Sequence, residues 1–239
     1  MIPIQDLNPT RRWPFLTWAL IVINVLVYLW EMGFSEGELF ATFQQISVVP
    51  ALFTAHPLAV ESLLDVLRSM FLHGGWAHLG GNMLYLYLFG DNLEDRFGRV
   101  AYLLLYFASG FVAVLAQVLI DPLSQIPLVG ASGAIAGVLG GYLVLFPRAR
   151  VRGIIPIGFF TRMAEWPAWI VLGMWFGLQL LSGLSSLGGA ANGGVAFFAH
   201  IGGFVCGALI AFLLMLVIPQ PDREERLDLM YEKAQRYRY

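Results

Sequence analysis

The hydrophobic positions of this chain gather in six long runs, which polar or charged stretches separate. A helix needs about 20 apolar residues to cross about 30 Å of hydrocarbon. The pattern therefore predicts an all-α, polytopic membrane protein in which six transmembrane helices form a bundle. The predicted spans are Phe15–Trp30, Leu79–Leu93, Val100–Ile120, Ala131–Phe146, Pro167–Leu184 and Val195–Ile218.

Composition supports this interpretation and excludes several classes of function. The chain is 58% hydrophobic and 13% charged, which is far more apolar than a soluble domain. Its formal net charge of -2 offers no basic surface, so we expect no nucleic-acid partner. Cys206 is the single cysteine, lies between Val205 and Gly207 in an apolar run, and is interpreted as a small packing residue.

Basic residues between the runs predict the orientation, because Lys and Arg in short loops stay on the cytoplasmic side. Both termini are predicted to be cytoplasmic. The first run follows Arg11 and Arg12 but lacks a small-residue cleavage site, so it is expected to remain as a span. We expect a multi-pass protein of a bacterial inner membrane. Its predicted parts are a cytoplasmic segment (1–13), a six-span domain (14–218) and a cytoplasmic tail (219–239).

The segment between the first two spans, 31–75, is too apolar for a plain connector. We expect it to lie in the outer membrane interface, with a helical stretch over Leu58–Phe71. The sequence leaves open whether this segment contacts lipid or a partner protein. The charged tail is expected to be solvated, and the oligomeric state is undetermined.

Four polar residues fall at a similar depth in three predicted spans. Ser132 opens the fourth span, His200 lies near the start of the sixth, and His78 and Asn82 are one turn apart at the start of the second. Polar side chains within lipid are costly when unsatisfied, so their common depth predicts that they meet.

Small residues on two spans would allow this meeting, because glycine and alanine let helix backbones approach closely. Ser132 and His200 each neighbour such a stripe, so packing the stripes together would bring hydroxyl and imidazole toward hydrogen-bond range. The stripes are Gly133, Gly137 and Gly141 on the fourth span and Ala199, Gly203 and Gly207 on the sixth.

This group of residues favours hydrolysis. A serine hydroxyl needs a base to become a nucleophile, and His200 is the candidate base for Ser132. Because no acidic residue lies at matching depth, we predict a Ser-His dyad whose imidazole is oriented by packing. His78 and Asn82 are candidate donors to a developing oxyanion. The histidines lack an accompanying carboxylate, so neither a metal nor another cofactor is expected.

Other interpretations remain for each feature. Alone, Ser132 could be a packing residue, and His200 could be a satisfied core residue or part of a proton relay. A non-catalytic, client-binding membrane protein of the same fold is the main alternative function. A transporter is a further alternative, but the polar residues cluster at one face and no repeated pair of broken helices is evident.

Three motifs together resemble the rhomboid family of intramembrane serine proteases, over about Phe15–Ile218. The nucleophile motif is similar to residues 130–133 (GASG), the histidine motif to 199–207 (AHIGGFVCG) and the His-x-x-x-Asn motif to 78–82 (HLGGN). The Trp-Arg pair that many members carry in the first loop is not evident.

The resemblance implies roles for individual residues. Ser132 would be the nucleophile, His200 the general base, and His78 and Asn82 the oxyanion-stabilising residues. It also implies that His73, Gly130 and Gly133 order the site, that Glu94 and Arg96 form a polar group at the inner end of the second span, and that Trp175 and Phe176 lie on a movable gate. Substrates would be single-span transmembrane proteins, cut near the outer membrane face after a small residue.

Overall fold

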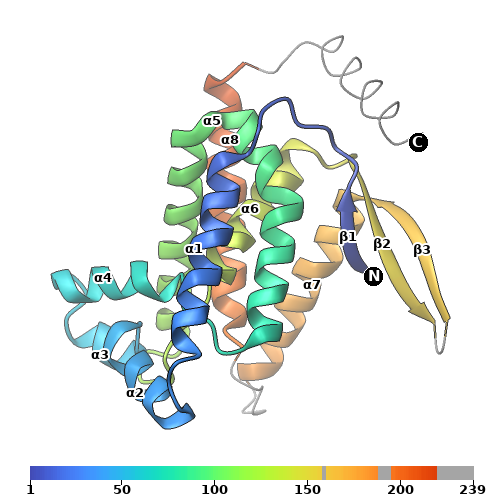
Figure 1. The fold of residues 1–239 in the computed structure, drawn as a ribbon. Helices are drawn as coiled ribbons and strands as arrows, with labels where there is room; N and C mark the ends of the chain where they lie inside the picture. The colour runs from blue at the N-terminus through green and yellow to red at the C-terminus, as the bar shows by residue number, and fades with distance from the viewer. Residues whose placement is uncertain (158–159, 188–194, 220–239) are drawn as a thin grey trace.

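The computed structural model describes residues 1–157, 160–187 and 195–219, and most of them are helical, as predicted (Figure 1). In chain order the elements are β1 (Ile2–Asp6), α1 (Phe15–Glu31), α2 (Glu36–Ile46), α3 (Pro50–Ala55), α4 (Val60–Ser69), α5 (Trp76–Ile120), α6 (Ser132–Leu145), β2 (Arg150–Ile157), β3 (Phe160–Pro167), α7 (Ala168–Leu187) and α8 (Phe197–Val217).

The long element α5 is two helices joined at a sharp turn. Gly98 has φ 77° and ψ 169°, a backbone conformation that residues with a side chain rarely adopt. The two arms, 76–97 and 99–120, run side by side in opposite directions (Figure 1). They correspond to the second and third predicted spans.

By length and composition, three helices of the described chain, α5, α7 and α8, could cross a membrane. The helices α1 and α6 are apolar but shorter. The aromatic and aliphatic side chains on the outer faces of these helices are largely exposed, as expected for surfaces that contact lipid.

The centre of the bundle is α6, in which every residue from 133 to 142 is buried. It packs between α5 and α8. A Cβ atom added at Gly203 would collide with the Gly133 carbonyl, and one added at Gly207 would collide with the Gly137 carbonyl. The close approach of α6 and α8 that the small-residue stripes predict is therefore confirmed.

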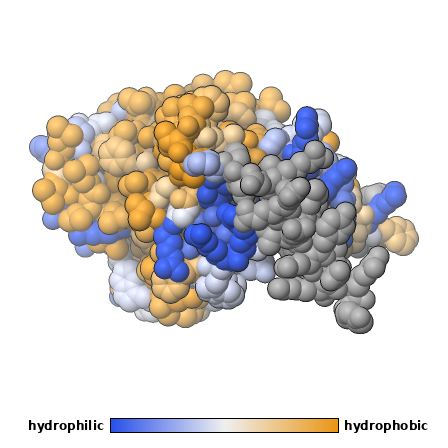
Figure 2. All heavy atoms as spheres, turned by 90° about the horizontal axis from the view of Figure 1, so that it is seen from above, coloured by the Kyte–Doolittle hydropathy of each residue, from blue (hydrophilic) through white to orange (hydrophobic). Residues whose placement is uncertain are grey.

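Polar residues form hydrogen bonds between helices at the end of the bundle where α5 turns. The Glu94 carboxylate accepts hydrogen bonds from the backbone N–H groups of Leu16 (2.9 Å) and Thr17 (2.8 Å), which are free at the start of α1. Arg96 donates to the carbonyl of Ile218 (2.8 Å). Figure 2 looks onto this end, where hydrophilic side chains gather near the centre and hydrophobic ones cover much of the rest.

A three-stranded antiparallel sheet, ordered β1-β2-β3, corrects the purely helical expectation. Pro3 pairs with Gly153, and Ile154 pairs with Met163. The strands are short and contain Arg, Gly and Pro, and β1 pairs with a segment that is distant in the chain. The hydrophobic pattern therefore gave no signal for strands in these segments, and they were expected to be loops. β1 shows that part of segment 1–13 packs against the rest of the fold.

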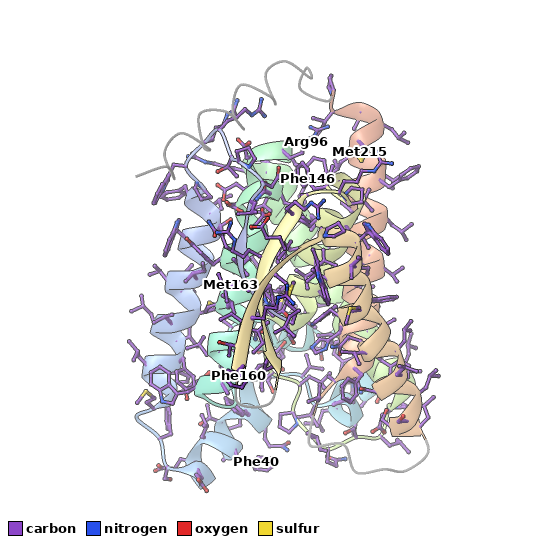
Figure 3. All side chains as sticks on the ribbon, turned by 90° about the vertical axis from the view of Figure 1, so that its right-hand side faces the viewer. Phe40, Arg96, Phe146, Phe160, Met163 and Met215 are labelled. Carbon is purple, nitrogen blue, oxygen red and sulfur yellow. The ribbon has the colours of Figure 1, made fainter. Side chains whose placement is uncertain are left out.

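The segment between α1 and α5 forms three short helices at the other end of the bundle from the α5 turn (Figure 1). Figure 3 shows Phe40 of α2 and Arg96 of α5 at these opposite ends. The helix α4 confirms the predicted helical stretch, and its Leu63 and Leu67 are exposed. Nearly all of the predicted tail, from residue 220 onward, lies outside the described residues.

Candidate active site

Ser132 is the first residue of α6, at the end of the bundle near α3 and α4. The loop before it is fixed by a hydrogen bond from the Gly130 N–H to the Ser69 carbonyl (2.8 Å). Gly130 has φ 128°, and a Cβ there would lie 2.7 Å from Nε2 of His78 and 3.6 Å from Oγ of Ser132. Only glycine leaves this space open, so His78 and Ser132 flank one small gap.

His200 lies in the first turn of α8 and faces Ser132. Its Nε2 is 2.9 Å from the Ser132 Oγ, which is hydrogen-bond distance. This contact follows from the packing of the glycine stripes, because Ser132 adjoins Gly133 and His200 is one turn before Gly203. The structure thus brings together the two residues that the sequence proposed as nucleophile and base.

The other imidazole nitrogen of His200 has a partner that the sequence analysis missed. Its Nδ1 is 2.8 Å from Oε1 of Gln179 on α7. Trp175, one turn earlier on α7, packs over the imidazole with ring centroids 5.8 Å apart. The sequence does mark Gln179 as unusual, because it is a polar residue within an otherwise apolar run. Only the fold shows which side chain it contacts.

His78 lies in the first turn of α5, and its hydrogen bonding fixes which nitrogen carries the proton. The Gly74 backbone N–H donates to Nδ1 of His78 at 3.4 Å. Nδ1 is therefore the acceptor, and Nε2, which lies against Gly130, carries the proton. This places an N–H donor beside Ser132.

Asn82 is one turn further along α5 and contacts His73, which is fully buried. The Asn82 Nδ2 is 3.0 Å from Nε2 of His73, and Nδ1 of His73 is 3.2 Å from the Phe71 carbonyl. A carbonyl can only accept, so Nδ1 carries the proton and Nε2 accepts from the amide. An amide nitrogen has two hydrogens, so Asn82 can hold this bond and donate a second one.

The loop that carries His73 is tied to α1 by Glu31, a second residue that the sequence analysis missed. The buried Glu31 carboxylate accepts the backbone N–H of His73 at 3.0 Å. Burial, with a smaller effect of neighbouring His78, lowers the pKa of His73 to about 4. His73 therefore stays neutral and remains an acceptor for Asn82 near neutral pH. The signal in the sequence was an acid at the end of the first apolar run.

A small cavity of about 40 Å³ adjoins Ser132. Most of its lining residues are small, among them Gly110, Gly133 and Ala199, and the larger ones are Met70, Val114, Leu128 and Val129. This volume suits water or a small side chain rather than an aromatic one.

The similarity of this chain to known proteins shows the family to which it belongs. Residues 60–217 match the model of the Rhomboid domain. The chain belongs to the rhomboid family. It is 28% identical over 219 residues to "Rhomboid protein 1, mitochondrial" of Saccharomyces cerevisiae, an alignment that covers 89% of this chain and 57% of that protein.

Two further rhomboid relatives illustrate the spread of the family. RHOMBOID-like protein 4 of Arabidopsis thaliana is 30% identical over 86% of this chain and 54% of its own length. Rhomboid protease AarA of Providencia stuartii is 28% identical over 84% of this chain and 73% of its own length. The chain spans little more than half of the yeast and Arabidopsis relatives. Membership makes it an integral membrane protein of a family of intramembrane serine proteases.

The structure also places several other residues of this rhomboid. Trp175 and Phe176 face α8, where the Phe176 ring stacks on Phe204 with centroids 4.5 Å apart. Cys206 is a free, partly buried thiol on α8. His56 caps the C-terminal end of α3 and is exposed. The described residues contain no cluster of three metal-ligating side chains.

Proposed function

We propose that this rhomboid is a serine endopeptidase that uses a Ser132-His200 dyad to cleave transmembrane segments of single-span membrane proteins near the outer membrane face. The observation that carries the proposal is the 2.9 Å contact between the His200 Nε2 and the Ser132 Oγ. A serine hydroxyl becomes a nucleophile when an adjacent base takes its proton, and this geometry allows that transfer.

The reaction would proceed in two stages. The Ser132 Oγ attacks the substrate carbonyl carbon while its proton passes to Nε2 of His200. As the peptide C–N bond breaks, His200 returns the proton to the leaving amine, and an acyl-enzyme remains on Ser132. Water then gives a proton to His200 and attacks the ester, and the released Ser132 Oγ recovers a proton.

Three N–H groups are the proposed donors to the oxyanion. Nε2–H of His78 adjoins Ser132 across Gly130, and the amide of Asn82 is held one turn away by His73. The Ser132 backbone N–H belongs to the first turn of α6, where helix N–H groups lack intrahelical partners. Such preorganised donors stabilise negative charge as it develops.

The membrane arrangement follows as part of the same proposal. The six helical segments α1, the two arms of α5, α6, α7 and α8 would each span the membrane within a domain covering residues 14–218. The end with the Arg11–Asp95 ion pair and Arg96 would face the cytoplasm together with both termini. The end with α2, α3 and α4 would lie at the outer face, where a bacterial inner membrane meets the periplasm.

The site also supports the proposed class of substrate. The cavity beside Ser132 is lined mainly by small residues, so it favours a small side chain next to the cleaved bond. A helical peptide carbonyl is already hydrogen-bonded within its own helix, so the substrate span would have to unwind locally before reaching Ser132.

Labelling with a fluorophosphonate probe tests the proposal. Detergent-purified protein should form an adduct at Ser132, mapped by mass spectrometry, and both S132A and H200A should lose it while keeping the wild-type unfolding temperature. Reconstituted wild-type protein should then cleave a single-span reporter with alanine at the cut site faster than one with phenylalanine there. Folded wild-type protein without an adduct would instead favour the client-binding function.

A further inference from the structure

The imidazole of His200 can act as a base toward Ser132 only in one of its two neutral tautomers. Nε2 must be unprotonated to take the hydroxyl proton, so the ring proton must sit on Nδ1. In serine hydrolases a buried acceptor at Nδ1 usually fixes this tautomer. The described part of this chain places no carboxylate within hydrogen-bond distance of the His200 imidazole.

Gln179 supplies an acceptor at this position. Its Oε1 lies 2.8 Å from Nδ1, while Nε2 of the same ring lies 2.9 Å from Ser132. The three side chains form a continuous chain of hydrogen bonds that links α7, α8 and α6. The amide carbonyl accepts without carrying charge, which suits a site within an apolar bundle better than a buried carboxylate does.

We infer that Gln179 is a positioning residue for the proposed protease, holding His200 in the tautomer and orientation that accept the proton of Ser132. The inference rests on the proposed function, because it concerns the same dyad. The sequence predicted that packing alone orients the imidazole. The inference assigns this role to a specific hydrogen bond.

The position of Gln179 on α7 makes the orientation of His200 depend on how α7 packs. Gln179 belongs to α7, whose Trp175 and Phe176 pack on His200 and Phe204 of α8. The orientation of the base therefore depends on α7 remaining packed on α8. A displacement of α7 would remove the acceptor from Nδ1 even if Ser132 and His200 stayed in place.

Two substitutions of matched length separate hydrogen bonding from packing. Gln179→Met keeps the shape of the side chain and removes the acceptor, whereas Gln179→Glu keeps an acceptor. The readout is the second-order rate constant for fluorophosphonate labelling at Ser132 as a function of pH, alongside the unfolding temperature. Leu178→Met, at a 60% exposed position on the same helix, is the control for methionine on α7.

The inference predicts that Q179M labels at least about tenfold more slowly than wild type without a matching fall in unfolding temperature. Q179E should label within about threefold of wild type at its optimum, and the acid limb of its profile should move to higher pH. That movement is expected because a carboxylate at Nδ1 stabilises the protonated imidazole.

Three outcomes would overturn the inference. They are wild-type labelling by Q179M, equal slowing of Q179M and Q179E, and an unmoved acid limb in Q179E. The acid limb of the Q179E profile remains a decisive measurement even if Q179M does not fold. Labelling of wild-type Ser132 tests the proposed function separately, so a labelled wild type with an equally labelled Q179M would reject only the role of Gln179.

Discussion

The carbonyl of Gly133 on α6 occupies the space that a side chain at Gly203 on α8 would fill. The two helices therefore touch through their backbones at the level of the candidate site. This contact sets the separation of α6 and α8, and with it the distance between Ser132 and His200. Glycine at position 203 is a condition for the dyad.

Gly203→Ala should lower the free energy of unfolding by about 1–3 kcal/mol, because the added methyl group meets a backbone atom that cannot rotate away. Labelling of the remaining folded protein should also slow, since the helices must separate. Thermal unfolding in detergent and the labelling rate measure the two effects. Gly177→Ala is the matched control, because a Cβ there meets no heavy atom within 4 Å among the described residues. Equal stability of the two variants would contradict this packing.

His78→Ala and Asn82→Ala should each slow labelling of Ser132 by about 10²–10³-fold, because the phosphonyl oxygen of the probe would occupy the place of the oxyanion. The Gly74 N–H on Nδ1 directs the His78 donor, and His73 holds the Asn82 amide. His56→Ala removes a histidine outside the site and should label like wild type. Wild-type rates in both site variants would remove these residues from the proposed oxyanion site.

His73 should make a contribution to the stability of the folded protein that is lost in acid. Its pKa is about 4 in the folded protein, below the ordinary value of 6.5, since burial disfavours the charged form. Between pH 6.5 and 4 the unfolded chain binds a proton that the folded chain does not. The stabilisation is therefore complete above pH 6.5 and is lost as the pH falls toward 4, by roughly 3 kcal/mol in total.

Thermal unfolding at a series of pH values measures this dependence. His73→Gln keeps a hydrogen-bonding side chain and does not titrate, so it should unfold with a flatter dependence between pH 6.5 and 4. Glu31 and His78 are the titratable neighbours and remain in both proteins. Identical slopes for wild type and H73Q would assign the acid sensitivity to other groups.

The N-terminal strand is tied to the bundle by Asp6, whose carboxylate accepts from the Tyr142 hydroxyl (2.8 Å) and from Asn92 (2.7 Å). Tyr142→Phe should lower the free energy of unfolding by about 1.5–3 kcal/mol, because it removes a partly buried hydrogen bond to a charged acceptor. The unfolding temperature should fall by about 2–4 °C for each kcal/mol.

Labelling of folded Y142F should match wild type, since Asp6 and Tyr142 lie near the opposite end of the bundle from Ser132. Tyr87→Phe, at a position that is 52% exposed, is the control for loss of a tyrosine hydroxyl. If Y142F and Y87F unfold at the same temperature, the Asp6 contact contributes nothing measurable.

Much of the fold could be predicted from local patterns. Apolar runs give the positions of helices in lipid, because a spanning segment must satisfy its own backbone hydrogen bonds. The glycines on α6 and α8 indicated which faces meet, and their contact is observed. The proximity of Ser132 and His200 followed from these two signals, and the family match agrees with the motifs around them.

Other features of the fold and the site could not be predicted from local sequence patterns. The sheet depends on pairing between β1 and β2, which lie about 150 residues apart in the chain. The contact of Glu31 with His73 joins two segments whose patterns say nothing about each other. Gln179 is recognisable as an unusual polar residue, but its partner depends on how α7 rotates against α8.

The sequence by itself determined the helical, membrane-embedded class and the candidate dyad, because hydrophobic length and glycine spacing act along a single helix. The tertiary structure alone decided which side chains complete the site, including the acceptor at His200 and the groups that hold Asn82. Hydrogen bonds are short and directional, so they depend on the placement of helices to within a fraction of an ångström. No pattern along the chain encodes that placement.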